Sequence, residues 1–222
     1  MAEKINKLDH GLFIVFEGGE GSGKTTQAKM LAERLTQKGY DILVTKQPGG
    51  DESICKAIRA LVLDPQYFGT VSSRAEFLLF MADKAQHIDS VIQPALARGK
   101  IVLSDRYSAS TFAYQVVARE SCSREEFDFV ARYALQGLQP HLTIWLDVDP
   151  VAGMQRNRAV PSQQLRFEKE TIEFHRRVRE GYEEYLTKHT DPSRVLRVDA
   201  GRSIDQNHAT IIERMKELLQ GR

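Results

Sequence analysis

The sequence predicts an α/β fold in which helices cover both faces of a five-stranded parallel sheet. Three observations support this prediction. Short, β-rich apolar runs alternate along the chain with longer segments of helical periodicity. The apolar runs are continuous, which is typical of strands buried on both faces. Glycine-rich and charged residues follow the ends of these runs, at the edge of a parallel sheet where ligands bind.

The first two strands are predicted at 12–16 and 42–45. A glycine-rich turn and a helix at about 25–38 follow the first strand, and Gly39 suits the position after the end of that helix. The second strand ends at the breaker Pro48-Gly49-Gly50, which indicates a turn rather than a continuing strand.

The other three strands are predicted at 101–104, 142–148 and 195–199. Asp147, near the end of the fourth strand, is expected to cap the next helix rather than to touch a ligand. No repeat, low-complexity tract or linker interrupts the pattern, so we expect residues 1–222 to form a single domain. The remaining helices are expected at about 52–63, 73–97, 108–118, 123–137, 167–188 and 203–220.

The composition is that of an ordinary globular protein, with 41% hydrophobic and 27% charged residues. The 31 basic and 30 acidic residues leave a net charge of +1, which creates no strong field for nucleic acid. No apolar run approaches the roughly 20 residues of a membrane span, and the polar N-terminus lacks a signal peptide. Cys55 and Cys122 suit a reducing compartment. We therefore expect a cytoplasmic protein with no membrane or nucleic-acid partner.

One motif has a specific chemistry. Its spacing fits G-x-x-x-x-G-K-[ST] between a predicted strand and a predicted helix, a context that argues against a chance glycine-rich turn. Backbone N–H groups of such a loop and the start of the following helix point at phosphate oxygens. Lys24 can reach the β- and γ-phosphates, and the hydroxyl of Thr25 can hold Mg²⁺. The sequence thus predicts a P-loop NTPase-type fold that binds ATP through Gly18, Gly19, Glu20, Gly21, Ser22, Gly23, Lys24 and Thr25.

The reaction is not fixed by the P-loop, which defines only the donor. The sequence contains no N-K-x-D motif of the kind that GTPases use to read guanine. An ATPase would need a carboxylate at the end of an apolar strand, and the best candidate, Asp105, is followed at once by Arg106. A cation there suits a second anion better than a water nucleophile, so a kinase of a small phosphorylated acceptor is favoured.

A polar segment at about 155–167 carries three arginines, Arg156, Arg158 and Arg166, around a central Pro161-Ser162. Phosphoryl transfer between two polyanions needs cations and the exclusion of water. A short mobile lid would supply both. An ordinary solvated loop is an equally good interpretation of this segment by itself.

Several separated segments match one family in order and spacing, and they are 16–27, Pro48-Gly49-Gly50, 76–87, 92–96, 105–115 and 140–143. On these segments the chain resembles the thymidylate kinases, a family of nucleoside monophosphate kinases, over about residues 12–215. The resemblance implies that the chain transfers the γ-phosphate of ATP to dTMP with Mg²⁺, that dTDP is the product, and that the protein is a homodimer.

The resemblance also implies roles for individual residues. Arg106 and Arg59 would hold the dTMP phosphate, and Phe80 would stack on thymine. Thr111 and Gln115 would line the thymine edge. Lys84 stands where the family has an arginine that reaches a carbonyl of the base. Tyr114 would crowd the 2′ position of the sugar and so favour deoxyribose. Asp105 would join Thr25 beside the Mg²⁺. The catalytic residues would be Lys24, Arg106, Arg158 and Arg166.

The chain departs from the family pattern at four places, and all of them concern the acceptor or the lid. Gln47 replaces a glutamate, and Lys84 replaces a forked donor with a point charge. In the lid, Gln164-Leu165 stands where Leu-Asp is usual, and Val160 stands where an arginine is expected. Three functions stay open: a thymidylate kinase of altered efficiency, which the shared acceptor residues favour, a kinase of a related pyrimidine deoxynucleotide, and a nucleotide-binding sensor without turnover.

Overall fold

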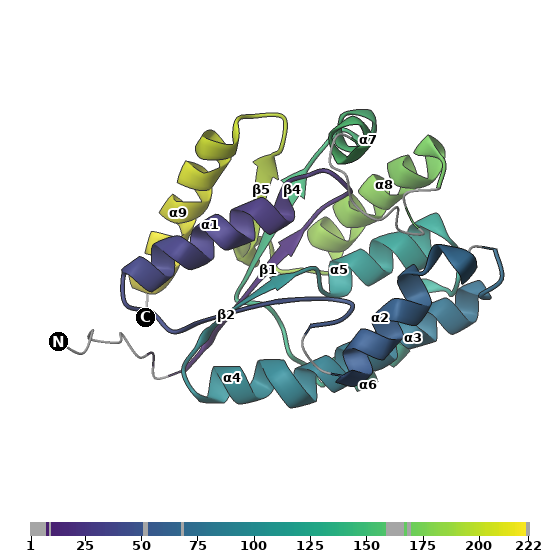
Figure 1. Ribbon diagram of the computed structural model, residues 1–222, viewed down its shortest axis with the longest axis horizontal. Coiled ribbons are helices and arrows are strands. Elements are labelled where there is room, and N and C mark those ends of the chain that lie inside the picture. The colour runs from purple at the N-terminus through teal and green to yellow at the C-terminus, as the bar shows by residue number, and fades with distance from the viewer. Residues whose placement is uncertain are drawn as a thin grey trace.

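A computed structural model describes residue 8 and residues 10–50, 53–67, 69–158, 167 and 170–220, except for the side chain of Arg158. Five parallel strands form one sheet in the order β2-β3-β1-β4-β5, which confirms the predicted sheet (Figure 1). Their bounds are β1 (Leu12–Glu17), β2 (Ile42–Lys46), β3 (Ile101–Asp105), β4 (Leu142–Asp147) and β5 (Val195–Asp199).

Helices cover both faces of the sheet, as predicted (Figure 1). On one face, α1 and α9 pack on alternate side chains of β1 and β3, such as Ile14 and Leu103; on the other, α3, α4 and α6 pack on Phe13 and Val102. The α-helices are α1 (Lys24–Gln37), α2 (Ser53–Leu63), α3 (Ser73–His87), α4 (Gln93–Ala97), α5 (Ser108–Thr111), α6 (Arg124–Leu135), α7 (Pro150–Arg158), α8 (Ile172–Lys188) and α9 (Ile204–Gln220).

Two of the predicted helices contain π-helical segments. The expected helix at 73–97 consists of α3, the π-helical η2 (Ile88–Ile92) and α4, and the expected helix at 108–118 consists of α5 and the π-helical η3 (Phe112–Ala118). Each π-helical segment is only one or two turns long and lies directly beside an α-helix, so periodicity read over a longer window does not separate it. Such segments are frequent at functional sites, and η3 contributes two side chains to the cleft described below.

Helix α7 was not predicted, because Pro150 was interpreted only as the end of the fourth strand. Proline suits the first position of a helix, where its missing N–H group is not needed. The carboxylate of Asp149 caps the helix by accepting from the N–H groups of Val151 and Ala152, both at 3.0 Å. The prediction that Asp147 caps the next helix is therefore wrong.

The expected lid at about 155–167 is only partly described. Residues 155–158 belong to α7, and residues 159–166 lie outside the described residues.

Strand pairing brings together the segments that follow β1, β2 and β3. Phe16 of β1 and Lys46 of β2 both pair with Asp105 at the end of β3. The backbone N–H of Arg106 then donates to the carbonyl of Phe16 at 2.9 Å, directly before the glycine-rich loop. The carboxyl ends of three strands thus meet at one edge. None of the helices in the described part of the chain has the length and apolar character that a membrane crossing requires.

Candidate active site

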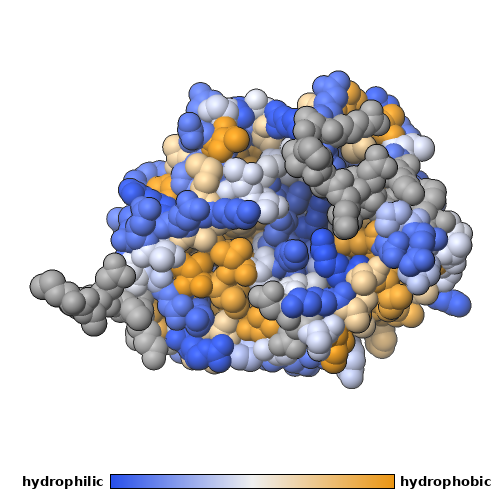
Figure 2. Space-filling view, in the orientation of Figure 1, coloured by the Kyte–Doolittle hydropathy of each residue, from blue (hydrophilic) through white to orange (hydrophobic). Residues whose placement is uncertain are grey.

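A cleft of about 770 Å³ opens at this edge of the sheet. Figure 2 shows a hollowed, mainly hydrophilic area near the centre of the same face. The cleft brings together side chains from α1, α2, α3, α5 and η3 that are far apart in the sequence. The residues from the sequence prediction that line it are Glu20, Gly21, Gly23, Lys24, Thr25, Arg59, Phe80, Lys84, Asp105, Arg106, Thr111, Tyr114 and Gln115.

Not every predicted residue is in this set. Gly18, Gly19 and Ser22 belong to the glycine-rich loop but do not line the cleft. The side chain of Arg158 and the whole of Arg166 lie outside the described residues, so their predicted roles stay predictions.

Two glycines of the loop have conformations that explain them. Gly23 precedes α1 with a φ of +89°, where other residues are strained although nothing would touch an added Cβ. Gly21 has a φ of +67°, and a Cβ there would lie 2.0 Å from the carbonyl oxygen of Gly153 in α7. The loop therefore needs glycine at Gly23 for its backbone angle and at Gly21 also for the close approach of α7.

Lys24 lies against its own loop. Its ammonium donates to the carbonyl of Gly19 at 2.7 Å and to the hydroxyl of Ser22 at 3.2 Å. Burial, together with the nearby charge of Arg106, lowers the pKa of Lys24 to about 8, and Glu20 partly opposes this effect. A buried ammonium of this kind gains strongly from a neighbouring anion.

Thr25 and Asp105 meet at the floor of the cleft. The hydroxyl of Thr25 donates to the carboxylate of Asp105 at 2.6 Å, and both residues line the cleft beside Lys24. Mg²⁺ in nucleotide sites takes one or two hard protein oxygens and completes its shell with phosphate oxygens and waters. The hydroxyl and the carboxylate fit that demand.

Arg106 connects the glycine-rich loop with the rest of the cleft. Its guanidinium donates to the carboxylate of Glu20 at 2.7 Å, to the carbonyl of Gly18 at 3.1 Å and to the hydroxyl of Tyr182 at 2.8 Å. Its φ of +76° is unusual for a residue with a side chain and is the kind of local strain that gathers at functional sites.

Glu20 is the anionic partner in this arrangement. Burial raises the pKa of Glu20, but the nearby Arg106 and Lys24 lower it to about 2, so the carboxylate is ionised. It also accepts from the hydroxyl of Tyr114 at 2.8 Å. Glu20 therefore links the glycine-rich loop to two predicted acceptor residues, Arg106 and Tyr114.

Three aromatic rings form one wall of the cleft, those of Phe80, Tyr114 and Phe167. The ring of Phe80 lies 6.1 Å from that of Phe167, and the ring of Tyr114 meets Phe167 edge-on at 5.4 Å. Phe167 was not recognised as a site residue, because an aromatic residue at the start of a predicted helix is typical of a core position. Its contact with two predicted acceptor residues was visible only in the fold.

Polar groups are buried beside these rings. Lys84 is 2% exposed, and burial lowers its pKa to about 8, an effect that Asp83 and Glu17 only partly oppose. Gln115 is completely buried within the cleft wall, and Thr111 lies near it, 3% exposed. Such groups are costly to bury unless they are hydrogen-bonded, and the amide of Gln115 has two partners, Glu76 at 2.7 Å and Ser121 at 3.0 Å.

Arg59 and Gln47 extend the cleft toward the turn after β2. Arg59 donates to the carbonyl of Pro48 at 2.6 Å, and burial lowers its pKa. Gln47 is 2% exposed and donates from its side-chain amide to Nδ1 of His87 at 3.0 Å. Nε2 of His87 meets the hydroxyl of Thr45 at 2.8 Å. The residue that departs from the family pattern is thus fixed by a buried imidazole.

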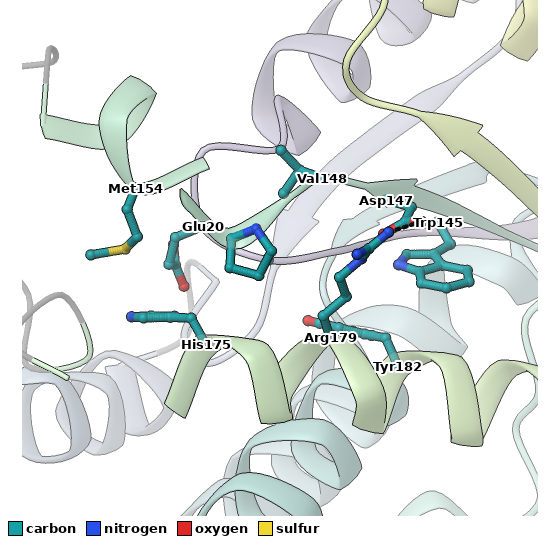
Figure 3. A pocket seen from close by; sticks show the side chains of 10 residues that line it. Glu20, Trp145, Asp147, Val148, Met154, His175, Arg179 and Tyr182 are labelled. Atoms are coloured by element: carbon teal, nitrogen blue, oxygen red, sulfur yellow. Dashed lines mark hydrogen bonds and ion pairs between the residues drawn. The ribbon is translucent and has the colours of Figure 1, made fainter. Parts of the chain in front are cut away.

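A second, much smaller pocket separates the loop from α8. In Figure 3, Glu20 and His175 point toward one another across it, and Arg179 reaches toward Asp147. Arg179 donates to both carboxylate oxygens of Asp147, at 2.7 and 3.1 Å. Asp147 therefore anchors α8 beside the loop instead of capping a helix.

Sequence reasoning missed the residues that support Arg106. The hydroxyl of Tyr182 donates to the carbonyl of Gly18 at 3.1 Å, and the hydroxyl of Ser110 lies 3.2 Å from the guanidinium. Ser110 also donates to the buried carboxylate of Glu17 at 2.5 Å. Only Ser110 and Glu17 stood inside quoted segments, so the sequence offered a weak signal for them and none for Tyr182.

Comparison with known proteins gives a consistent result. A family model described as thymidylate kinase matches residues 16–211. The chain is 42% identical over 217 residues to a thymidylate kinase of Pelobacter propionicus, and the matched region covers 96% of this chain and 95% of the relative. It is 44% identical over 209 residues to a thymidylate kinase of Cutibacterium acnes, covering 94% and 98%. A thymidylate kinase of Synechococcus is 44% identical over 189 residues, covering 85% and 86%.

Proposed function

Because the chain belongs to the thymidylate kinase family, we propose that it transfers the γ-phosphate of ATP to dTMP in the cleft at the carboxyl edge of the sheet, giving dTDP. The observation that carries this proposal is the continuity of the cleft. One cleft contains both Lys24, in the glycine-rich loop, and the side chains of Arg106 and Phe80. A donor and an acceptor could therefore meet in it.

The donor triphosphate would bind the N–H groups of the loop and the ammonium of Lys24. Phosphates would replace the contacts that Lys24 makes with Gly19 and Ser22. The anion would raise the pKa of Lys24 again and keep it charged. Thr25 and Asp105 would hold Mg²⁺, which neutralises phosphate charge and orients the donor when it is bound.

The acceptor phosphate would bind Arg106, with Arg59 on the side of the turn after β2. Arg106 is held in place by Glu20, Gly18 and Tyr182, so a bound phosphate meets a guanidinium that is already oriented. The acceptor phosphate is ionised at neutral pH, so transfer needs positioned cations rather than a strong general base. Arg158 and Arg166 would add cations on the transferring group.

The acceptor base would stack on Phe80, with Lys84, Thr111 and Gln115 at its polar edge. Tyr114 would contact the sugar, where its position between Glu20 and Phe167 limits the space for a 2′-hydroxyl. All three edge residues are almost completely buried, and each could make a further hydrogen bond to a bound base.

The test is a product assay with ATP, Mg²⁺ and each deoxynucleoside monophosphate in turn. We expect dTDP and ADP in equal amounts with dTMP and much less diphosphate with the others. A preference for another pyrimidine deoxynucleotide would transfer the proposal to that acceptor. Binding without diphosphate would show a sensor, and ADP formation without an acceptor would show an ATPase.

We also propose that the protein is a homodimer. Phe129 and Tyr133, one turn apart on α6, are 74% and 86% exposed, and Leu78 on the neighbouring α3 is 50% exposed. Large apolar side chains gathered on one outer face favour a protein partner. Light scattering should give twice the monomer mass, and the double variant F129D/Y133D should give the monomer. V151D, at an exposed apolar residue of α7, should not change the mass.

A further inference from the structure

We infer that Arg119, at the end of η3, is a positioning residue that sets how the cleft recognises the base of the acceptor. It does not itself line the cleft among the described residues. It acts instead on Gln115 through Glu76, and it packs behind the aromatic wall at Phe167. The inference rests on the proposed function, because it concerns the same acceptor pocket.

The first contact is with a completely buried carboxylate. One oxygen of Glu76 accepts from Nε of Arg119 at 2.8 Å and from the side-chain amide of Gln115 at 2.7 Å. Removing one partner of a buried ion pair leaves the other charge uncompensated. Arg119 therefore holds the carboxylate of Glu76 in the position from which it also binds Gln115.

The position of Glu76 decides which way the amide of Gln115 points. A carboxylate anion only accepts, so the NH₂ group of Gln115 must face Glu76. The amide oxygen of Gln115 accepts from the hydroxyl of Ser121 at 3.0 Å, which supports the same orientation. If Glu76 moved away from Gln115, this contact would be lost, and the amide could then rotate by half a turn.

That rotation would exchange the hydrogen-bonding groups that Gln115 presents to the cleft. Thymine offers an N3–H donor beside an O4 acceptor, whereas cytosine offers an N3 acceptor beside an N4–H₂ donor. The two bases are opposite in polarity along this edge. An amide of fixed orientation can therefore distinguish them, and an amide that rotates cannot.

The other contacts of Arg119 support the aromatic wall. Its Nη2 donates to Glu170 at 2.7 Å, and its guanidinium lies 5.2 Å from the ring of Phe167 and 5.1 Å from that of Phe174. Phe167 in turn faces Phe80. A lysine could keep the charge beside Glu76, but it has no planar fork to reach two carboxylates and stack on two rings.

The test uses R119M and R119K in the full chain, with kcat and KM for dTMP, KM for ATP, and kcat/KM for dCMP. We expect R119M to lower the dTMP/dCMP ratio of kcat/KM about tenfold or more, with KM for ATP unchanged. We expect R119K to keep most of this ratio but to raise KM for dTMP, because it retains the charge and loses the wall contacts. E76Q should lower the ratio as R119M does, and the double variant should lower it no further.

The matched control is R124M. Like Arg119, Arg124 donates two hydrogen bonds to glutamate; both go to Glu184 of α8, at 2.6 and 2.7 Å. Arg124 does not line the cleft. R124M should leave the acceptor ratio unchanged. An unchanged ratio in both R119M and E76Q, with only thermal stability reduced, would overturn the inference and leave Arg119 a structural residue.

Gln115 separates the two levels of the argument. If Q115M loses the dTMP/dCMP ratio while R119M and E76Q keep it, the positioning role fails and the proposed acceptor site stands. If Q115M keeps the ratio, the assignment of Gln115 to the base edge fails, and the role of Arg119 fails with it. E76Q and R119K keep the inference testable if R119M does not fold.

Discussion

The two halves of the cleft are built in different ways. The proposed donor half is formed by the glycine-rich loop, a continuous stretch of eight residues of which Glu20, Gly21, Gly23, Lys24 and Thr25 line the cleft. The acceptor half collects side chains from α2, α3, α5 and η3, and the departures from the family pattern that fall in the cleft, Gln47 and Lys84, belong to it. A site made of backbone resists change in its side chains, whereas a site made of side chains can be retuned one residue at a time.

Lys24 and Lys84 make the same contrast in electrostatic terms. Burial lowers the pKa of both to about 8. In the proposed complex, Lys24 would meet a polyanion that restores its charge, while Lys84 would meet a neutral base that does not. The charge of Lys24 would then be insensitive to pH once its ligand binds, and that of Lys84 would not.

The largest expected effect is at the donor half. K24A should reduce kcat about 100-fold or more, because it removes a preoriented cation from the transferring phosphate. ADP release in a coupled assay measures this, and circular dichroism should show an intact fold. K56A, at an exposed lysine of α2, is the control. Near-normal turnover in K24A would break the distinction between the halves.

Arg106 tests whether the halves are separate. R106A should weaken dTMP binding about 100-fold and ATP binding much less, because the charged hydrogen bonds to a phosphate are lost on the acceptor side. Calorimetry with each nucleotide measures both affinities. The contact with Glu20 predicts a small loss for ATP as well. An equal loss for both ligands would mean that Arg106 serves the donor.

The pH dependence sharpens the comparison of the two lysines. Between pH 7 and 9.5, KM for dTMP should rise severalfold as Lys84 loses its proton near pH 8, while KM for ATP should change less. K84R should maintain or improve recognition of dTMP and remove most of the rise. Kinetics of both proteins over this range measure the effect, and a parallel rise in K84R would show that another group titrates.

The same low pKa values predict that the folded protein becomes more stable as the pH rises, although its binding of dTMP becomes weaker. Both lysines have a lower pKa in the folded chain than the roughly 10.4 of an exposed lysine. Between about pH 8 and 10.4 the unfolded chain therefore binds more protons, and the contribution of these groups to the free energy of unfolding rises with pH. Denaturant unfolding of K84M should lack part of this rise.

The smallest expected effect is at Gln47. Q47E places a carboxylate beside Nδ1 of His87, which now accepts from the amide. The imidazole would have to carry its proton on Nδ1 and accept from Thr45 at Nε2, an exchange of tautomers that keeps both hydrogen bonds. We expect kcat/KM for dTMP to change by less than about threefold and stability by about 1 kcal/mol. A loss comparable to that of R106A would give Gln47 a direct role.

The sequence predicted what depends on contiguous residues. The five strands, the glycine-rich loop and the family all follow from local patterns. Three features were not predicted. The π-helical segment η3 and the start of α7 at Pro150 each depend on the geometry of a single turn. The role of Asp147 depends on arginines distant in the chain, Arg179 and Arg197. Tyr182 and Arg119 escaped notice for a related reason: their importance lies in contacts with residues more than forty positions away, and no local pattern encodes such contacts.

The pairing of β1 with β3 has an evolutionary consequence. The hydrogen bond from Arg106 to Phe16 ties the proposed anchor of the acceptor phosphate to the strand that precedes the glycine-rich loop, so a slip of one residue would move the two by about 3.3 Å. Under the proposed function, the backbone ladder would set the gap that the phosphoryl group crosses. Descendants of this chain could acquire a new acceptor base by changing side chains on α3 and η3 while inheriting the reaction distance intact.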